Sequence, residues 1–402
     1  MSRSICCALL FASAHALGGG FAISDQDASA SGRGSTAIAA ASTASAVHFN
    51  PAGLGGLDGP AVSAGATLIL PGATAADRTL GPGGPDVTAS QAAVKVPPHV
   101  YGAMGLGRFS IGAGFNAPFG GGLKWPEPWR GRMELVEMNL QVLAGHLGGA
   151  WQITDQLSIG IAGALYSASV GLDKRIDYVD SEGKALLGGS GLGFGASAGV
   201  QYAPIAELRL GLTGRIPATV FMNGRVHFDD PPGAFRSTLP DQAIRTTLVL
   251  PAKVAIGAAA KLPWLRLSAD VEYTFWSSFQ TFFIDFENNA TPDVNQPRRW
   301  DNAPTFRLGA ERDFGLTTVR LGGLVDLAAS PSDTLSPSLP DSTRVGFSVG
   351  VGRALGPVRG DLAYQFIAFL PRASTGDAFP AHYNANANLI ALSLGWKHSP
   401  AP

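Results

Sequence analysis

Residues 266–275 read Arg-Leu-Ser-Ala-Asp-Val-Glu-Tyr-Thr-Phe, and polar and apolar side chains alternate along them without a break. Successive side chains of a β-strand point to opposite faces, so this period of two predicts a strand with one polar and one apolar face. Glu207–Arg215 and Arg344–Gly352 show the same alternation. A membrane barrel that meets lipid on its outside and encloses polar groups produces this pattern.

Fourteen segments of the chain can form strands of this kind. Short connections such as Thr154–Gln156 alternate with long ones such as Gly120–Leu135, as in barrels with tight periplasmic turns and extended outer loops. The sequence therefore predicts an all-β fold, a transmembrane antiparallel β-barrel of about 14 strands. The other predicted strands are Pro60–Leu70, Val100–Gly107, Phe109–Asn116, Val136–Gln152, Leu157–Leu172, Gly191–Tyr202, Ile244–Lys261, Thr305–Asp313, Thr317–Leu327, Val358–Phe369 and Asn388–Trp396.

The composition favours a membrane barrel over a soluble or helical protein. Charged residues make up 15% of the 402-residue chain, against about a quarter in soluble domains. Beyond the first residues, no apolar run reaches the roughly 18 residues of a membrane-spanning helix, so a helical membrane protein is excluded. The formal net charge of −1 provides no basic surface, and no nucleic-acid partner is expected.

The start of the chain has the features of a secretory signal peptide. Met1-Ser2-Arg3 is a short basic region, Ile5–Ala14 is apolar, and Ala14-His15-Ala16 is a small-x-small cleavage site. We therefore predict a signal peptide over residues 1–16. Both cysteines of the chain, Cys6 and Cys7, lie within it, so the mature chain is expected to form no disulfide.

Small residues dominate the stretch Ala28–Ala46. Many inward positions of the predicted barrel are also small, so this stretch is expected to pack inside the lumen. Asn50 before Pro51 fixes a stop or turn, because the proline ring disfavours helical backbone at the preceding residue. We expect an N-terminal plug (hatch) over residues 17–58 and the transmembrane barrel over residues 59–402. The alternatives are a disordered periplasmic tail and, for Asn50-Pro51 alone, a plain turn.

A series of short motifs runs along the chain. They are Gly20-Phe21, Ser31–Gly34, Asn50–Leu54, Ala117–Gly120, Trp125-Pro126, Leu250–Ala252, Trp276–Phe279 and the segment from Ser330-Pro331 to Pro340-Asp341. Their order resembles the outer-membrane long-chain fatty-acid and hydrocarbon transporter family, the FadL/TodX group. The resemblance implies passive uptake of hydrophobic small molecules without enzymatic turnover, and it makes Asn50, Pro51 and Ala52 the plug motif. Long-chain fatty acids, alkanes and aromatic hydrocarbons all remain open as ligands.

A second motif points to where a ligand would leave. The predicted strand Phe109–Asn116 runs directly into Pro118, which has no N–H for the ladder of a closed wall, so a bulge or kink is expected. The resemblance implies that a kink in the third strand opens a lateral exit. The residues predicted to form it are Gly112, Gly114, Asn116, Pro118 and Gly120. The alternative is that the strand ends at Pro118.

Aromatic and flexible apolar side chains mark a candidate capture site. The predicted outer loop Gly120–Leu135 carries Trp125, Trp129 and Met133, and such groups suit a first contact with an apolar molecule. Phe21, which lies in the predicted plug, is also assigned to this predicted capture site. The alternative for the loop is an aromatic belt at the membrane interface.

Enzymatic and metal sites receive little support. Two Gly-x-Ser-x-Gly matches centre on Ser197 and Ser348, yet both lie in strand alternation and not at the strand-to-helix turn of a hydrolase. An outer-membrane barrel hydrolase acting on lipids stays one alternative, and a structural or adhesive barrel stays another. The histidines show no metal-ligand spacing and are expected mostly in loops or interfaces, although His48 adjoins the plug motif. No metal or other cofactor is expected.

Charged residues on the inward faces of the strands are expected to form a paired network that holds the plug to the wall, because unpaired buried charge is costly. One of these arginines could instead bind a carboxylate. The residues expected in this network are Arg209, Arg215, Arg266, Arg307, Arg320, Arg344 and Arg359 with Glu207, Asp270, Glu272, Glu311, Asp326 and Asp361.

The protein is expected to be a monomer in the Gram-negative outer membrane, with the plug and both termini on the periplasmic side. The expected partners are outer-membrane lipid, lipopolysaccharide and the barrel assembly machinery.

Overall fold

The computed structural model describes residues 20–41, 43–79, 86–91, 93–229, 231–376 and 379–397. The predicted signal peptide and both cysteines lie outside the described residues. The strands close into one antiparallel barrel, because β1 (Pro60–Asp77) pairs with β19 (Ala381–Lys397) on one side and with β3 (Pro98–Leu106) on the other. Among the described residues no helix is long and apolar enough to cross a membrane.

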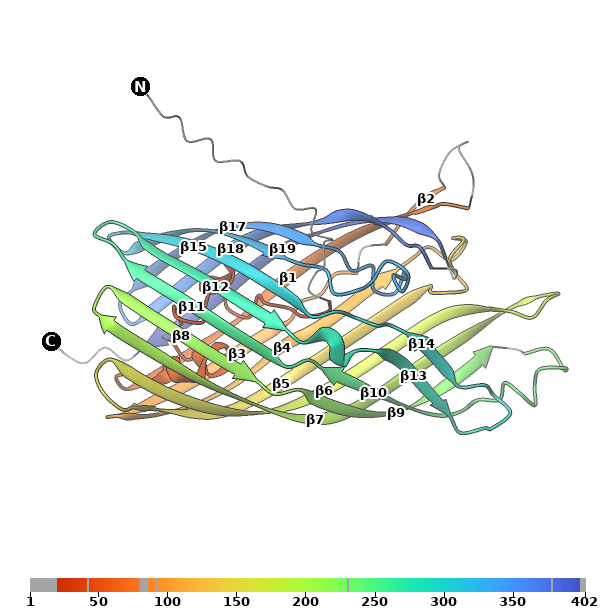
Figure 1. The fold of residues 1–402 in the computed structure, drawn as a ribbon, viewed down its shortest axis with the longest axis horizontal. Coiled ribbons are helices and arrows are strands. Elements are labelled where there is room, and N and C mark those ends of the chain that lie inside the picture. The colour runs from red at the N-terminus through yellow and green to blue at the C-terminus, as the bar shows by residue number, and fades with distance from the viewer. Residues whose placement is uncertain are drawn as a thin grey trace, which may run out of the picture.

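The predicted 14-strand barrel is confirmed. The described residues form nineteen strand elements. Eighteen make up the wall, in which four strands consist of two elements each, and the short β2 (Val87–Ala89) only covers the outer end of β1. Short turns gather at one end of the barrel and long loops at the other (Figure 1). The remaining elements are β4 (Phe109–Lys124), β5 (Glu137–Gln152), β6 (Leu157–Asp177), β7 (Glu182–Ile205), β8 (Leu208–Arg215), β9 (Ala218–Asp229), β10 (Gln242–Leu250), β11 (Lys253–Lys261), β12 (Arg266–Thr274), β13 (Thr281–Phe286), β14 (Val294–Pro297), β15 (Ala303–Phe314), β16 (Thr317–Asp326), β17 (Arg344–Leu355) and β18 (Val358–Ala373), with the short 3-10 helix η2 (Trp276–Ser278).

The outer face of the barrel is apolar. Outward side chains such as Leu147, Ile161 and Phe194 are 72%, 70% and 75% exposed. Their neighbours along each strand point inward and are small or buried, as the alternation predicted. Phe109 and Trp151 stack at 5.9 Å between ring centroids beside the short turns, where an interfacial aromatic girdle is expected.

Four neighbouring wall strands break at the same height. The register places Arg215 opposite Lys253, Lys253 opposite Thr274, and Thr274 opposite Ala303, and each strand is interrupted directly after this row. Two of the breaks follow from sequence, because Pro217 and Pro251 cannot donate to the ladder. The predicted strand Glu207–Arg215 is only the inner half of a longer wall strand, since β9 resumes the strand beyond the break and carries it to Asp229.

The N-terminal segment, which is coloured red in Figure 1, lies inside the barrel near the short turns. It contains two single-turn helices, α1 (Ala28–Ser31) and α2 (Ala46–Phe49), and the 3-10 helix η1 (Pro51–Leu54). The wall begins at Pro60. Nearly all residues of the segment are buried, so the small-residue stretch is packed against the wall and is not a free tail.

Candidate ligand path and plug

The predicted plug motif forms a hydrogen-bonded turn against the wall. Asn50 is fully buried, and its side-chain Nδ2 donates to the carbonyl of Ile38 at 2.9 Å and of Val200 at 3.3 Å. Its Oδ1 accepts from the backbone N–H of Ala52 at 3.2 Å, which caps η1. Pro51 occupies the first position of that helix, where its missing N–H costs nothing. The motif thus ties two parts of the plug to β7.

Wall glycines make room for this turn. A Cβ atom at Gly160 would lie 2.4 Å from the carbonyl carbon of Pro51, and one at Gly199 would lie 2.0 Å from Asn50 Oδ1. Real Cβ atoms stay beyond about 3.0 Å. Plug backbone therefore rests directly on wall backbone, as the paired runs of small residues predicted.

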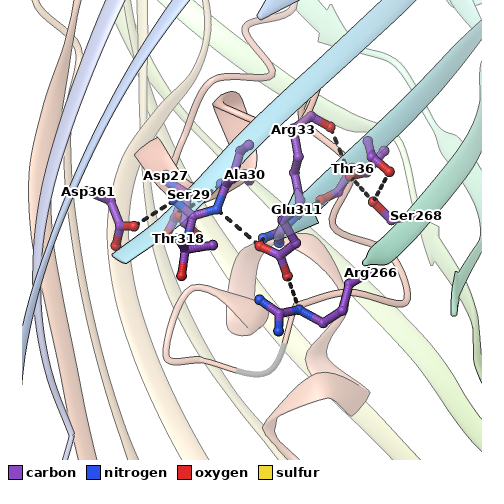
Figure 2. Close-up of polar contacts among 12 residues, drawn as sticks. Asp27, Ser29, Ala30, Arg33, Thr36, Arg266, Ser268, Glu311, Thr318 and Asp361 are labelled. Carbon is purple, nitrogen blue, oxygen red and sulfur yellow. Dashed lines mark hydrogen bonds and ion pairs between the residues drawn. The ribbon is translucent and has the colours of Figure 1, made fainter. Parts of the chain in front are cut away.

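Ion pairs fasten the plug to the opposite side of the wall. Glu311 accepts from Arg266 at 2.7 Å, and the plug residue Arg33 approaches it at 3.7 Å (Figure 2). Glu311 also accepts from Arg320 at 3.1 Å. Asp270 accepts from the backbone N–H groups of Ala37 and Ile38 at 2.6 and 3.0 Å. The expected network between plug and wall is present in these contacts, whereas Arg209 is exposed next to a turn.

The predicted strand Phe109–Asn116 continues as β4 to Lys124, so the alternative that it ends at Pro118 is wrong. β4 is the third strand of the wall. Its register against β5 shifts between Asn116 and Phe119, which is a bulge centred on Pro118. A proline inside a closed wall is tolerated here because the ladder is already interrupted.

The other edge of β4 loses its neighbour at the bulge. β3 pairs with β4 only as far as Phe115. Beyond it the N-terminal segment takes over from the inside: Ile23 N–H donates to the Pro118 carbonyl and Gly120 N–H donates to the Phe21 carbonyl, both at 2.9 Å. The unpaired stretch of wall is therefore covered by the plug and not by another wall strand.

The glycines predicted at the exit do not all line this stretch. Cβ atoms at Gly112 and Gly114 would lie 2.9 Å from Leu54 and 2.4 Å from Tyr101, so these two glycines face the lumen. Gly120 borders the interrupted ladder beyond the bulge. Gly121 also lines the space there, and the nearest atom to its Cβ position is 4.0 Å away.

A cavity of about 340 Å³ lies behind the unpaired part of β4. It is lined by inward side chains such as Leu140 and Arg307 and also by Asn139 and Gln141, which point outward from β5. The cavity therefore passes through the wall. The Lys95 ammonium group crosses its outer mouth and donates to Asn139 Oδ1 at 2.8 Å.

Phe21 stands at the inner end of this cavity within a cluster of aromatic rings. Its centroid lies 4.9 Å from Trp276, 5.8 Å from Phe279 and 6.1 Å from Trp300. A Cβ at the preceding Gly20 would approach both tryptophans to 2.6 Å, and its φ of +57° also favours glycine. The surrounding rings thus contact Phe21 from several sides, as they could contact an aromatic ligand.

A second, more apolar cavity of about 110 Å³ begins on the outer side of Phe21. Phe21 and Leu339 line both cavities and separate them. Most of the remaining lining is aliphatic or aromatic. It includes Met138, Val170, Leu172, Leu187, Met222, Leu248, Phe279, Phe282, Ile284 and Val294.

The predicted capture residues Trp125 and Trp129 are buried and stacked, with ring centroids 4.6 Å apart. Trp125 Nε1 donates to the Pro337 carbonyl and Trp129 Nε1 to the Leu135 carbonyl, at 3.3 and 2.7 Å. The interfacial-belt alternative is wrong, because the rings pack inside the loop cluster and do not face lipid. Met133 is half-buried in the same loop. A role of these residues in capture stays a prediction.

Comparison with known proteins identifies the family. A family model described as "Outer membrane protein transport protein (OMPP1/FadL/TodX)" matches residues 9–396. The chain belongs to this family. It is 25% identical to the "Long-chain fatty acid transport protein" of Salmonella typhi over 379 residues, 85% of this chain and 86% of that protein.

Solved structures of the family share its fold. A Pseudomonas aeruginosa FadL homologue superposes with a TM-score of 0.83 at 18% identity, covering 94% of this chain and 100% of that one. The P. putida toluene transporter TodX superposes with a TM-score of 0.78 at 17% identity, covering 93% and 99%. The protein is an outer-membrane transporter of hydrophobic compounds and not an enzyme. Consistent with this, Ser348 Oγ accepts from the plug Gly34 N–H at 2.9 Å within a strand.

Two residues that lie at the cavities were not identified from the sequence as candidate site residues. Asp341 accepts from the backbone N–H of Gly20 at 3.2 Å and from Ala329 and Ser330 at 2.7 and 3.0 Å, and its burial raises its pKa to about 6. Arg298 is buried beside the outer cavity. Asp341 stands in a motif recognised above, but Arg298 lies in a connection without regular alternation, where no pattern assigns a direction to the side chain.

Proposed function

We propose that this transporter takes up long-chain carboxylic acids passively. In this proposal the outer cavity captures the ligand, a shift of the plug lets it pass Phe21, and the ligand leaves sideways through the wall beside β4. The observation that carries the proposal is the wall itself: where β4 has no neighbouring strand, a cavity runs from the aromatic cluster to outward-facing side chains. A ligand on this route would pass from the largely apolar outer cavity into a cavity that also carries polar side chains such as Arg307 and Lys95, and would then meet lipid.

The carboxylate part of the proposal rests on Arg298. Its guanidinium donates to hydroxyl and amide oxygens, Ser336 Oγ at 2.8 Å and Gln296 Oε1 at 3.3 Å, while its Nε has no partner among the described residues. In the described part of the chain no carboxylate lies within 4.0 Å of it. An arginine guanidinium keeps its charge near pH 7. The Glu134 carboxylate, which lines the same cavity, acts on Arg298 only from a distance. A buried cation without a directly bonded carboxylate at the wall of a largely apolar cavity suits an amphiphilic anion.

Neutral hydrocarbons are the second candidate ligands, and one observation favours them. The four aromatic rings around Phe21, which are those of Phe119, Trp276, Phe279 and Trp300, would accept another ring in its place. Arg298→Met separates the two candidates, since it keeps the length of the side chain and removes the charge. Oleate binding to the purified barrel should weaken at least about tenfold, as expected for a lost charge-assisted hydrogen bond, whereas toluene binding should not change. Unchanged oleate affinity would exclude the carboxylate assignment.

The exit is tested by filling it. Gly121→Phe places a ring in the wall cavity, where a Cβ atom meets nothing closer than 4.0 Å. Gly145→Phe is the matched control, because that glycine lies on β5 with open space around its Cβ position. Oleate uptake should fall severalfold for Gly121→Phe, with ligand binding retained, and should stay normal for the control. Normal uptake by a correctly assembled Gly121→Phe barrel would exclude this exit.

A further inference from the structure

A buried chain of polar side chains joins the plug to the bulge of β4. His48 of α2 places Nδ1 3.3 Å from Nε2 of His146 on β5. The same Nε2 lies 3.0 Å from Asn116 Oδ1, and Asn116 Nδ2 donates to the Tyr101 hydroxyl at 3.0 Å. None of the four side chains is more than 7% exposed. Asn116 is the last residue before the register shift, so the chain ends on the bulge itself.

A second plug residue completes the connection. The Tyr101 hydroxyl donates to the Gln26 carbonyl at 3.1 Å. The Gln26 side chain donates from Nε2 to the Ala117 carbonyl at 2.8 Å and accepts at Oε1 from the Ala117 N–H at 3.3 Å. One side-chain amide thereby supplies both bonds that a neighbouring strand would give Ala117. The next residue is Pro118, which has no N–H, so the bulge depends on groups supplied from the plug.

A count of hydrogens shows that His146 serves two partners with one proton. Asn116 Oδ1 can only accept, so His146 Nε2 must carry its hydrogen there. His48 Nδ1 faces the same Nε2 atom of His146, and that nitrogen of a neutral imidazole carries only one hydrogen. Burial, and then the nearby Arg215 guanidinium, lower the pKa of His48 well below its usual value, so His48 stays neutral near pH 7 and its lone pair competes with Asn116.

We propose that His146 is a positioning residue that couples the seating of the plug to the shape of the wall opening. When α2 is seated, His146 divides its hydrogen between plug and bulge, and Gln26 holds Ala117. When the plug shifts as a unit, the contacts of His48 and of Gln26 are both lost. The hydrogen of His146 then passes wholly to Asn116, and the ladder around Pro118 rearranges. This inference rests on the proposed plug movement, but the coupling is a property of the protein without ligand.

Amide hydrogen exchange of the purified barrel tests the coupling. Asn50→Ala unseats the plug, and exchange at residues 109–124 reports on the bulge. We expect Asn50→Ala to accelerate this exchange by roughly 2- to 30-fold, the range that such networks transmit. In a His146→Phe background the acceleration should be clearly smaller, because only the contact of Gln26 with Ala117 is then lost when the plug is unseated. His146→Gln should restore it, because the amide places N–H donors near the position of Nε2.

The control is His99→Phe. His99 is equally buried on β3, and its Nε2 contacts Ser393 Oγ at 2.9 Å. Its ring stacks on Tyr101 at 5.9 Å between centroids, a contact that a phenylalanine ring can keep. An equal response to Asn50→Ala in the His146→Phe background, or its loss in the His99→Phe background, would overturn the proposal. His48→Ala removes the contact from the plug side and should match His146→Phe. Because exchange needs no ligand and no route, its outcome is independent of the Gly121→Phe uptake experiment.

Discussion

Gly199→Ala is a severe test of how the plug is held, because it adds one methyl group to the wall and changes nothing in the plug. The new Cβ would lie 2.0 Å from Asn50 Oδ1 and 3.1 Å from the Leu212 carbonyl oxygen. The Leu212 carbonyl belongs to a paired strand and cannot retreat. Asn50 must therefore leave its position.

The energetic consequence follows from the hydrogen bonds that Asn50 makes. It has three, to Ile38, Val200 and Ala52, and each contributes roughly 0.5–1.5 kcal/mol net. Losing them destabilises the seated plug by about 2–4 kcal/mol, which raises the unseated fraction roughly 30- to 700-fold. The wall keeps its ladder, so assembly should be unaffected.

Three measurements follow. The heat-induced shift in gel mobility should remain, and passage of a small polar solute should increase. Ligand uptake should fall, because a plug that is already unseated makes no further shift when ligand binds. Asn50→Ala should behave alike, and the double variant should be no worse than either, since both remove the same contacts. Gly171→Ala, with open space at its Cβ, is the control. A sealed, fully active Gly199→Ala barrel, or additive effects in the double variant, would refute this reasoning.

Three further predictions concern other parts of the barrel. Leu147→Arg places a charge on the lipid face at a cost of up to about 2–4 kcal/mol, so less folded barrel should be recovered from membranes. Trp129→Ala should increase protease cleavage of the loop between β4 and β5, because it removes a buried ring worth about 3–5 kcal/mol of packing. Burial raises the pKa of Asp341 to about 6, above the roughly 3.9 of an unfolded aspartate. Its contribution to stability is therefore present below about pH 4 and is lost as the pH rises through 6. The wild type should lose stability relative to Asp341→Asn between pH 4 and 7, as measured by the denaturant midpoint.

The fold was largely predictable because each strand carries its own signal. Arg266–Phe275 alternates over its whole length, and the structure makes β12 of nearly the same residues. The strand Ile244–Lys261 was predicted as one piece, yet it divides at Pro251 into β10 and β11. Alternation alone cannot show that four neighbouring strands break at the same height, because that depends on register between segments distant in sequence.

The site was less predictable for the same reason. The small residues of the plug and wall indicated close packing, but not which glycine faces which plug residue. His146 was expected in a loop or interface, and it is buried inside the barrel, where it meets a plug residue 98 positions away. Gly112 and Gly114 were assigned to the exit from their proximity to Pro118, yet the pleat of the strand points them at the plug.

The aligned breaks in four of the fourteen wall strands mark, on that side of the barrel, a boundary between two parts that can change separately. Between the row from Arg215 to Ala303 and the short turns, plug backbone lies on wall backbone. A mutation in that part of the wall therefore needs a compensating mutation in the plug. On the other side of the row, side chains from separate strand elements line the outer cavity and can be exchanged one at a time. Ligand preference can therefore diverge among descendants of such a protein while the seal stays fixed. For the engineer, the same row is the place to join the outer half of one barrel to the inner half of another.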